Sequence, residues 1–390
     1  MKDKEIEKLI KSEEKRQKSV INLIPSENYV SRDVLTALGS IFDNKYAEGY
    51  PNKRYYGGNT LTDKLELLCQ KRARKAFGLS EKLWSVNVQP HSGSPANLAV
   101  YLALVPMGGK IMGMTLTAGG HLTHGQKVSL TGKAWQQVPF GVDAKTEILD
   151  YKALKMLAIK EKPNLIIAGF TAYPREINFK KFREIADSCG ALLMVDMSHN
   201  AGLIAGGVYN SPFKYADVVT TTTHKTLRGP RSAIIFSRID TRELYKKIDK
   251  AIFPGLQGGP HMGQIAGVAV ALKEASTPAF KRYAKQVLKN SQALASELGR
   301  LGWRIVSGWT ESNLLLVDTW MGGKGIPGKE AEIKLEKAGI ICNKNTIPGE
   351  MRSPFDPSGI RLGPAAETTL GKKEKDMIKI ARKIDSILRK

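Results

Sequence analysis

The chain has 390 residues, of which 42% are hydrophobic and 25% are charged, a composition typical of a globular protein with about two to three domains. No run approaches the roughly 18 apolar residues that a transmembrane helix needs, and the first residues form no apolar core of a secretory signal peptide. We therefore expect a cytoplasmic protein without membrane contacts. The cysteines, Cys69, Cys189 and Cys342, are far apart and predict reduced thiols.

The formal net charge of +23, from 60 basic and 37 acidic residues, raises the question of nucleic-acid binding. The basic residues are spread along the chain, and the basic C-terminal tail also carries Met377, Ile380 and Ile384 at helical spacing. Such a tail predicts a packed amphipathic helix. We expect the charge to reflect a generally basic proteome or anionic small substrates, and at most weak, non-specific nucleic-acid binding.

In chain order, the charged segment 4–18 predicts a surface helix. From about residue 61, helical patterns alternate with short apolar runs, which predicts a mostly parallel sheet with helices on both faces, an α/β fold. The expected strands are 84–88, 110–114, 165–170, 192–196, 218–222 and 233–236.

A Gly/Pro-rich stretch at 253–260 interrupts this pattern, and a long helical run follows to about residue 299. The remaining segment contains strand candidates at 304–307, 313–317 and 340–342. We predict an N-terminal arm (1–50), a large domain (51–258) and a smaller C-terminal α+β domain (259–390).

The chain lacks the phosphate-binding G-x-x-x-x-G-K-[ST] motif, a strand followed by G-x-G-x-x-G, and the zinc motif H-E-x-x-H. These absences disfavour P-loop enzymes, common dehydrogenases and zincins. Among the six histidines only the pair His121 and His124 is close in sequence, so no metal site is expected.

Three segments suggest binding of an anionic cofactor. Ser92, Gly93 and Ser94 precede a helical pattern, where free backbone N–H groups bind anions; an ordinary helix cap is the alternative. Asp196 ends an apolar strand, where ligands bind in open α/β sheets, although it could be a solvated acid.

Lys225 follows a β-branched strand, and the cations His224, Arg228 and Arg231 predict a lowered pKa that favours the free amine. An unremarkable surface lysine is the alternative. An anion site, an aspartate and a lysine are together what a protein supplies to pyridoxal phosphate. Their order in the chain fits the fold-type I class.

The chain resembles serine hydroxymethyltransferases along nearly its whole length. The motifs that carry the resemblance are NLIPSEN at 22–28, NKYAEGYPNKRYYGG at 44–58, NVQPHSGS at 87–94, GGHLTHG at 119–125, VDMSH at 195–199, TTTTHKT at 220–226, FPGLQGGP at 253–260 and SGIRLG at 358–363.

The resemblance implies a role for each matching residue. Lys225 would form the internal aldimine with pyridoxal 5'-phosphate, Asp196 would hold the ring nitrogen protonated, and His121 would stack on the ring. Further cofactor contacts are implied for Ser92, Gly93, Ser94, Thr171, His199, His224, Tyr46 and Gly259. Substrate contacts are implied for Arg361, Ser26, Tyr56 and Glu48, with Glu48 and Tyr56 also catalytic. Tetrahydrofolate contacts are implied for Leu116, Gly120, His121, Leu122, Tyr55, Asn345, Ser353, Pro354 and Phe355.

The implied activity is reversible conversion of serine and tetrahydrofolate into glycine and 5,10-methylenetetrahydrofolate. The implied assembly is a homodimer with shared active sites, which could pair into tetramers. Tyr46, Glu48, Tyr55 and Tyr56 would reach into the other subunit's site, and the Gly258–Gly259 turn would help to hold its phosphate. A folate-independent threonine or allothreonine aldolase and an RNA-binding protein on a retired enzyme scaffold are the alternatives.

Overall fold

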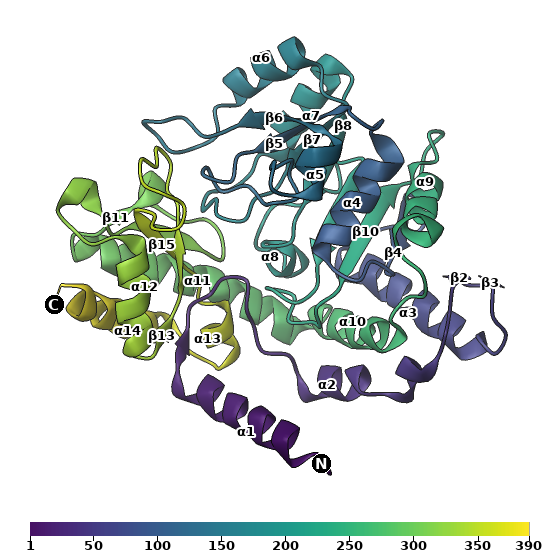
Figure 1. The fold of residues 1–390 in the computed structure, drawn as a ribbon, viewed down its shortest axis with the longest axis horizontal. Coiled ribbons are helices and arrows are strands. Elements are labelled where there is room, and N and C mark those ends of the chain that lie inside the picture. Colours follow the sequence, from purple (N-terminus) through teal and green to yellow (C-terminus); the bar gives the residue numbers. More distant parts are fainter. Residues whose placement is uncertain (390) are drawn as a thin grey trace.

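The computed structural model describes residues 1–389, and its centre is a seven-stranded mixed sheet (Figure 1). The strand order is β4 (Trp84–Asn87), β10 (Ala233–Arg238), β9 (Val218–Thr222), β8 (Leu192–Asp196), β7 (Leu165–Ala168), β5 (Lys110–Met114) and β6 (Gln136–Phe140). Strands β9, β8, β7, β5 and β6 are parallel, whereas β10 runs antiparallel to β9 and β4. The expected α/β fold with a mostly parallel sheet is confirmed.

Consecutive side chains of the central strands are buried on opposite faces of the sheet. Ile166 joins one hydrophobic cluster and Ile167 the other, as expected for a sheet covered on both sides. One face is covered by α4 (Gly93–Leu104), α5 (Leu130–Ala134) and α9 (Leu244–Lys250). The other is covered by α3 (Thr60–Ala76), α6 (Tyr151–Glu161), α7 (Phe179–Cys189), α8 (Ala201–Ala205) and α10 (Met262–Ala275).

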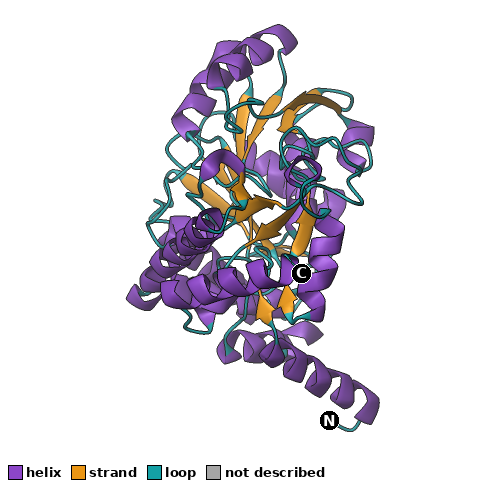
Figure 2. Cartoon of the chain, turned by 90° about the vertical axis from the view of Figure 1, so that its left-hand side faces the viewer, coloured by secondary structure: helices purple, strands orange, loops and turns teal. Residues whose placement is uncertain are grey.

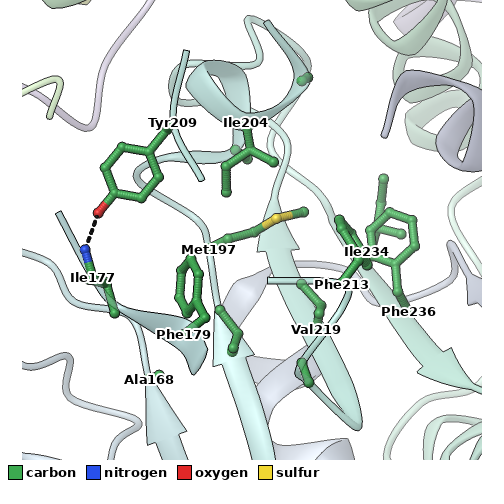
Figure 3. Close-up of a cluster of buried hydrophobic side chains, with 14 of the residues drawn as sticks. Ala168, Ile177, Phe179, Met197, Ile204, Tyr209, Phe213, Val219, Ile234 and Phe236 are labelled. Atoms are coloured by element: carbon green, nitrogen blue, oxygen red, sulfur yellow. Dashed lines mark hydrogen bonds between the residues drawn. The ribbon is translucent and has the colours of Figure 1, made fainter. Parts of the chain in front are cut away.

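Figure 3 shows part of the larger cluster, where Val219, Ile234 and Phe236 from β9 and β10 lie near Phe213. At its edge the Ile177 backbone N–H donates a hydrogen bond of 3.0 Å to the Tyr209 hydroxyl. The buried hydroxyl therefore has a partner, as buried polar groups require.

The C-terminal part forms a second core around a four-stranded antiparallel sheet, to one side of the large sheet in Figure 1. Its strand order is β11 (Arg304–Ile305), β12 (Leu315–Asp318), β15 (Gly359–Leu362) and β14 (Asn343–Asn345). The helices are α11 (Pro278–Arg300), α12 (Gly328–Lys337), α13 (Ala365–Thr369) and α14 (Glu374–Leu388). The predicted amphipathic tail helix is confirmed, since α14 buries Met377, Ile380 and Ile384.

The N-terminal segment begins with α1 (Lys4–Ser19), which contains no buried residue and projects from the body (Figure 2), so the predicted surface helix is confirmed. Next, β1 (Ile21–Asn22) pairs with β13 (Ile340–Ile341). After α2 (Arg32–Leu38), a hairpin of β2 (Gly49–Tyr50) and β3 (Lys53–Arg54) lies on the side of the molecule away from the small sheet (Figure 1). None of the described helices could cross a membrane.

Some sequence-based strand assignments were wrong. The interpretation missed β6, whose residues alternate between exposed and buried at the sheet edge, as well as β14 and β15. The candidate at 304–307 is a strand only at Arg304–Ile305 and continues as the short helical turn Val306–Gly308. The candidate at 340–342 pairs with β1 and not with the small sheet.

The domain boundary at residues 258 and 259 stays a prediction. The hydrophobic cluster of the large sheet includes Val287 on α11 and Ala365 on α13, while Leu294 and Leu298 on α11 belong to the cluster of the small sheet. Helix α11 therefore contributes to both cores.

Candidate active site

A cavity of about 280 Å³ lies beyond the carboxyl ends of β8 and β9, where open α/β sheets bind their ligands. It brings together side chains from segments far apart in the sequence. Of the residues predicted from sequence, Ser26, Ser92, Gly93, Ser94, His121, Thr171, Asp196, His199, His224, Lys225 and Arg361 line it.

Asp196, the last residue of β8, is held by hydrogen bonds to both carboxylate oxygens. Oδ2 accepts from Asn97 Nδ2 at 2.9 Å and lies 3.2 Å from His124 Nε2, and Oδ1 accepts from the Ser198 hydroxyl at 2.6 Å. Burial alone would raise the pKa of Asp196, but the hydrogen bonds from His124 and Ser198 hold it well below its usual range. The cavity therefore contains a permanent buried negative charge.

Lys225 follows β9, is half-buried and lines the same cavity as this carboxylate. Burial lowers the pKa of Lys225 to about 8, against the opposing effect of Asp196. The positive charges of Arg361 and Arg231 add to the lowering. A much larger fraction of the amine is thus unprotonated near neutral pH than in an ordinary lysine, as a nucleophilic amine requires.

The direction of the Lys225 shift was predicted correctly, but two of its assumed causes were wrong. His224 is not a cation, because burial lowers its own pKa to about 3. The Arg228 guanidinium instead lies 4.2 Å from the centre of the Tyr283 ring, where a cation–π contact holds it. Burial, the largest cause, could not be recognised from adjacent residues.

Helix α4 directs its N-terminus toward the cavity. Its cap residue, Ser92, makes no side-chain hydrogen bond to the first turn, so this hydroxyl is available to a ligand. A Cβ added to Gly93 would lie 2.6 Å from Thr222 Cγ2, and the buried Thr222 hydroxyl has no partner among the described residues. These unpaired groups around a helix N-terminus suit a phosphate.

At the opposite side of the cavity, Arg361 extends from β15 and is 7% exposed. Its Nη1 donates to the Thr171 carbonyl at 2.8 Å and its Nε to Asn343 Oδ1 at 3.1 Å. Burial lowers the pKa of Arg361 to about 10, so the group stays charged at neutral pH. No described carboxylate pairs with it, and a buried unpaired guanidinium is suited to an anionic substrate group.

Two histidines in the cavity are held neutral. Burial and then the charge of His124 lower the pKa of His121 to about 4, and its Nδ1 lies 2.8 Å from the Thr123 hydroxyl. Burial also lowers the pKa of His199, and neither of its ring nitrogens has a partner among the described residues. A neutral His121 ring can lie against an aromatic ligand without a charge penalty.

Comparison with known proteins agrees with this arrangement. The family model for serine hydroxymethyltransferase matches residues 1–384. The chain is also 53% identical over 386 residues to a serine hydroxymethyltransferase from Desulfotalea psychrophila (strain LSv54 / DSM 12343), a match that covers 99% of this chain and 88% of that protein. The chain belongs to the serine hydroxymethyltransferase family. Its activity is the reversible conversion of serine and tetrahydrofolate into glycine and methylenetetrahydrofolate, with pyridoxal phosphate as cofactor.

The cavity fits this cofactor. It offers unpaired groups at the N-terminus of α4 for the phosphate, an ionised carboxylate for a protonated ring nitrogen, and a lysine with a lowered pKa for the aldehyde. These features match the three chemical demands of pyridoxal phosphate. The family relationship does not favour the aldolase or the RNA-binding alternative.

The residues predicted to serve a second subunit do not line the cavity of their own chain. Tyr46, Tyr55 and Tyr56 are exposed. The Tyr46 hydroxyl donates to Glu48 Oε1 at 3.1 Å, and the Tyr46 and Tyr56 rings pack edge to face at 4.9 Å. A Cβ on Gly259 would contact the Tyr46 ring at 3.7 Å, so Tyr46, Tyr56 and the half-buried Glu48 and Gly259 form one group.

The predicted folate residues lie on exposed loops and on β14. Leu116 and Leu122 are exposed, and so are Ser353, Pro354 and Phe355, with Phe355 84% exposed. Gly120 has no room for a side chain, because a Cβ would lie 2.0 Å from the Met114 carbonyl oxygen. Asn345 is half-buried and its Nδ2 donates to the Thr346 carbonyl at 2.7 Å. Together they offer exposed apolar side chains without a ligand-shaped cavity.

The residues that orient Asp196 were missed from sequence. Asn97 lies one helical turn into α4 and also accepts a hydrogen bond of 2.8 Å from the Thr220 hydroxyl through Oδ1. His124 was noticed only as a possible metal ligand. A polar residue inside the apolar α4 pattern was the available signal for Asn97, but its partner on β8 could not be known without the fold.

Proposed function

We propose that Lys225 binds pyridoxal phosphate covalently through Nζ while Asp196 pairs with the ring nitrogen. The single observation that carries this assignment is that one cavity encloses an ionised buried carboxylate and a lysine whose pKa is about 8. The N-terminus of α4, with Ser92, Gly93 and Ser94, would hold the phosphate. When bound, the cofactor withdraws the electron pair left on the substrate Cα after the bond to Cβ breaks.

The remaining residues of the cavity would bind the substrate and orient the cofactor. The free edge of the Arg361 guanidinium would bind the serine carboxylate, because a planar fork of donors matches two carboxylate oxygens. The neutral His121 ring would lie against the cofactor ring. Ser26, Thr171, His199 and His224 line the same cavity and would contact the substrate or the cofactor from its sides.

We further propose that the chain acts as a homodimer in which each subunit completes the other's site. The group of Tyr46, Glu48, Tyr56 and Gly259 and the exposed Tyr55 support this arrangement, since these residues do not line their own cavity. Glu48 would move the proton of the serine hydroxyl as the one-carbon unit leaves. A cytoplasmic location stays a prediction.

Tetrahydrofolate would bind above the cavity entrance against Leu116, Leu122, Tyr55 and Phe355. These side chains are exposed in the single chain, and apolar surfaces are suited to a flat aromatic pterin. His121 and Asn345, with Gly120, Ser353 and Pro354, would supply the closer contacts.

Borohydride reduction tests the covalent assignment. The loaded wild-type chain should retain the cofactor after reduction and denaturation, with the added mass on the peptide that contains Lys225. Lys225→Ala should lose the label entirely while still binding the cofactor non-covalently. A labelled peptide elsewhere in the wild-type chain would contradict the assignment.

A further inference from the structure

Two buried polar side chains lie between the end of β4 and the phosphate-binding segment at 92–94. Asn87 ends the strand and Gln89 follows it, and they are 4% and 2% exposed. Neither lines the cavity. Their side chains bond instead to the first of two segments that the proposed function assigns to the partner's active site, and the Gln89 backbone carbonyl bonds to the second.

The first segment is the β2–β3 hairpin, which connects Glu48 to Tyr55 and Tyr56. Gln89 Nε2 donates to the Gly49 carbonyl at 2.9 Å and to Glu66 Oε1 on α3 at 3.0 Å. Each hairpin strand has only two residues, and a two-stranded hairpin has little stability of its own. Its position therefore depends on contacts such as this one.

The second segment is the Gln257–His261 loop, which contains Gly258 and Gly259. Gln257 Nε2 donates to the Gln89 carbonyl at 2.9 Å, and Gln257 Oε1 accepts from the His91 backbone N–H at 3.0 Å. The His91 and His261 rings also stack at 3.9 Å with an angle of 5° between their planes. The loop is thus fixed to the residues next to the chain's own phosphate site.

Asn87, two residues before Gln89, also bonds to the hairpin. Its Nδ2 donates to the Tyr50 hydroxyl at 3.1 Å and to Asp249 Oδ1 at 2.7 Å. The Tyr50 hydroxyl in turn donates to the Asp249 carbonyl at 2.6 Å. Asp249 lies in α9, just before the turn Ala251–Leu256 that leads into the Gln257–His261 loop, so Asn87 connects the hairpin to the helix that precedes this loop.

We propose that Gln89 is a positioning residue for the partner's active site: its side chain fixes the hairpin relative to its own chain's phosphate-binding segment, while its backbone carbonyl receives the Gln257 side chain that fixes the Gln257–His261 loop. This inference rests on the proposed function, in which both segments serve the other subunit. Gln89 touches neither substrate nor cofactor of its own site. Its loss therefore disturbs catalysis across the dimer interface.

A mixed dimer with a single intact site tests the proposal. One chain carries Lys225→Ala and the other Glu48→Ala, with different affinity tags for purification. The intact site then takes Lys225 from the Glu48→Ala chain, the acceptor, and its hairpin from the Lys225→Ala chain, the donor. Gln89→Met, which keeps the side-chain length without the amide, is added to either the donor or the acceptor.

We expect Gln89→Met in the donor to lower kcat/KM for serine by about tenfold or more, since the hydrogen bonds to the buried Glu66 side chain and to the Gly49 carbonyl are lost. The same change in the acceptor should leave kcat/KM within about twofold, because the acceptor's own hairpin serves only the inactive site. Both dimers carry one altered chain, so their thermal stabilities should be equal. A stability effect alone cannot produce the difference.

Three results would overturn the proposal. They are a loss of kcat/KM only when Gln89→Met is in the acceptor, an equal loss in both placements, and no loss in either placement. A parent mixed dimer that is inactive without any change at Gln89 would overturn the shared site itself, which is a separate result. If Gln89→Met prevents folding, Gln257→Met should give the same donor-only loss. Gln286→Met is the matched control, since Gln286 bonds Asn290 and Glu374 between α11 and α14 and should show no dependence on placement.

Discussion

At the scale of single residues, Arg361 carries the proposed substrate contact. Its Nε and Nη1 are held by Asn343 and Thr171, which orients the rest of the fork toward the cavity. Arg361→Lys keeps the positive charge but replaces the planar guanidinium with an ammonium group. Loss of one charge-assisted hydrogen bond of about 1.5 to 3 kcal/mol should raise KM for serine about ten- to a hundredfold.

Arg175→Lys is the control for this measurement, since Arg175 pairs with Glu311 outside the cavity at 3.1 Å. It should leave KM for serine unchanged. An unchanged KM in Arg361→Lys as well would show that the serine carboxylate binds elsewhere.

The protonation state of the Lys225 amine predicts how the rate of cofactor attachment depends on pH. With a pKa of about 8, roughly a tenth of the amine is free at pH 7 and about nine-tenths at pH 9. Attachment needs the unprotonated amine, so its rate in the cofactor-free protein should rise about tenfold between these pH values and then level off. Stopped-flow absorbance measures it. A rate that keeps rising beyond pH 10 would indicate an ordinary lysine.

The raised pKa of Asp249 predicts that folding stability depends on pH. Burial raises its pKa from 3.8 to about 6, against the hydrogen bond from Asn87. Between pH of about 4 and 6 the Asp249 carboxyl is ionised in the unfolded chain but still protonated in the folded chain. The free energy of unfolding therefore falls as the pH rises through this range, by about 3 kcal/mol at most.

Asp249→Asn stays neutral and should recover that loss. The urea midpoint of the variant should exceed that of the wild type at pH 8 and equal it at pH 4. An equal difference at both pH values would mean that ionisation of Asp249 is not the cause. The exposed Asp187→Asn provides a control, because Asp187 pairs only on the surface with Arg183.

At the scale of elements, the close approach of α4 and β9 shapes the proposed phosphate site. Because a Cβ on Gly93 would lie 2.6 Å from Thr222 Cγ2, Gly93→Ala should push the helix N-terminus away from β9. Cofactor affinity should fall, although alanine favours the helix. Titration of the cofactor-free protein measures the change.

Adding Thr222→Ser should restore part of the affinity in Gly93→Ala, because serine keeps the hydroxyl and removes the colliding methyl group. Gly141→Ala is the control, since its Cβ would meet only the Ala118 Cβ at an ordinary 3.7 Å. If Gly93→Ala bound the cofactor as tightly as the control, the helix N-terminus would not hold the phosphate.

The elements also show what the sequence could predict. Strands β5, β8 and β9 begin and end as predicted, because each is a continuous apolar or β-branched run buried on both faces. Strand β6 lies at the sheet edge with a mixed burial pattern, and β15 has only four residues, including a glycine and an arginine. Their pairing depends on distant segments, which local patterns do not report.

The residues of the cavity, too, divide into those that local patterns predict and those that depend on contacts between distant segments. Asp196, Lys225 and the Ser92–Ser94 segment could be proposed from the ends of strands and helices, and the family motifs added Arg361. The contacts of Asn97 with Asp196 and of Gln89 with Gly49 span 99 and 40 residues. They follow from how α4, β8 and the hairpin pack, so no local pattern predicts them.

At the scale of the whole molecule, the net charge of +23 predicts some affinity for nucleic acid. We expect this affinity to be independent of sequence and to collapse between about 50 and 200 mM salt, as counterion release requires. Fluorescence anisotropy with two unrelated RNA sequences measures it. Tight, sequence-selective binding at the higher salt would indicate a specific nucleic-acid function.

The chain transfers the one-carbon unit of serine to tetrahydrofolate. Glycine formation from serine by the cofactor-loaded protein, measured with and without tetrahydrofolate, tests this activity. We expect glycine and methylenetetrahydrofolate in equal amounts, and very little glycine when folate is omitted. Glycine formation at the same rate without folate would contradict this expectation.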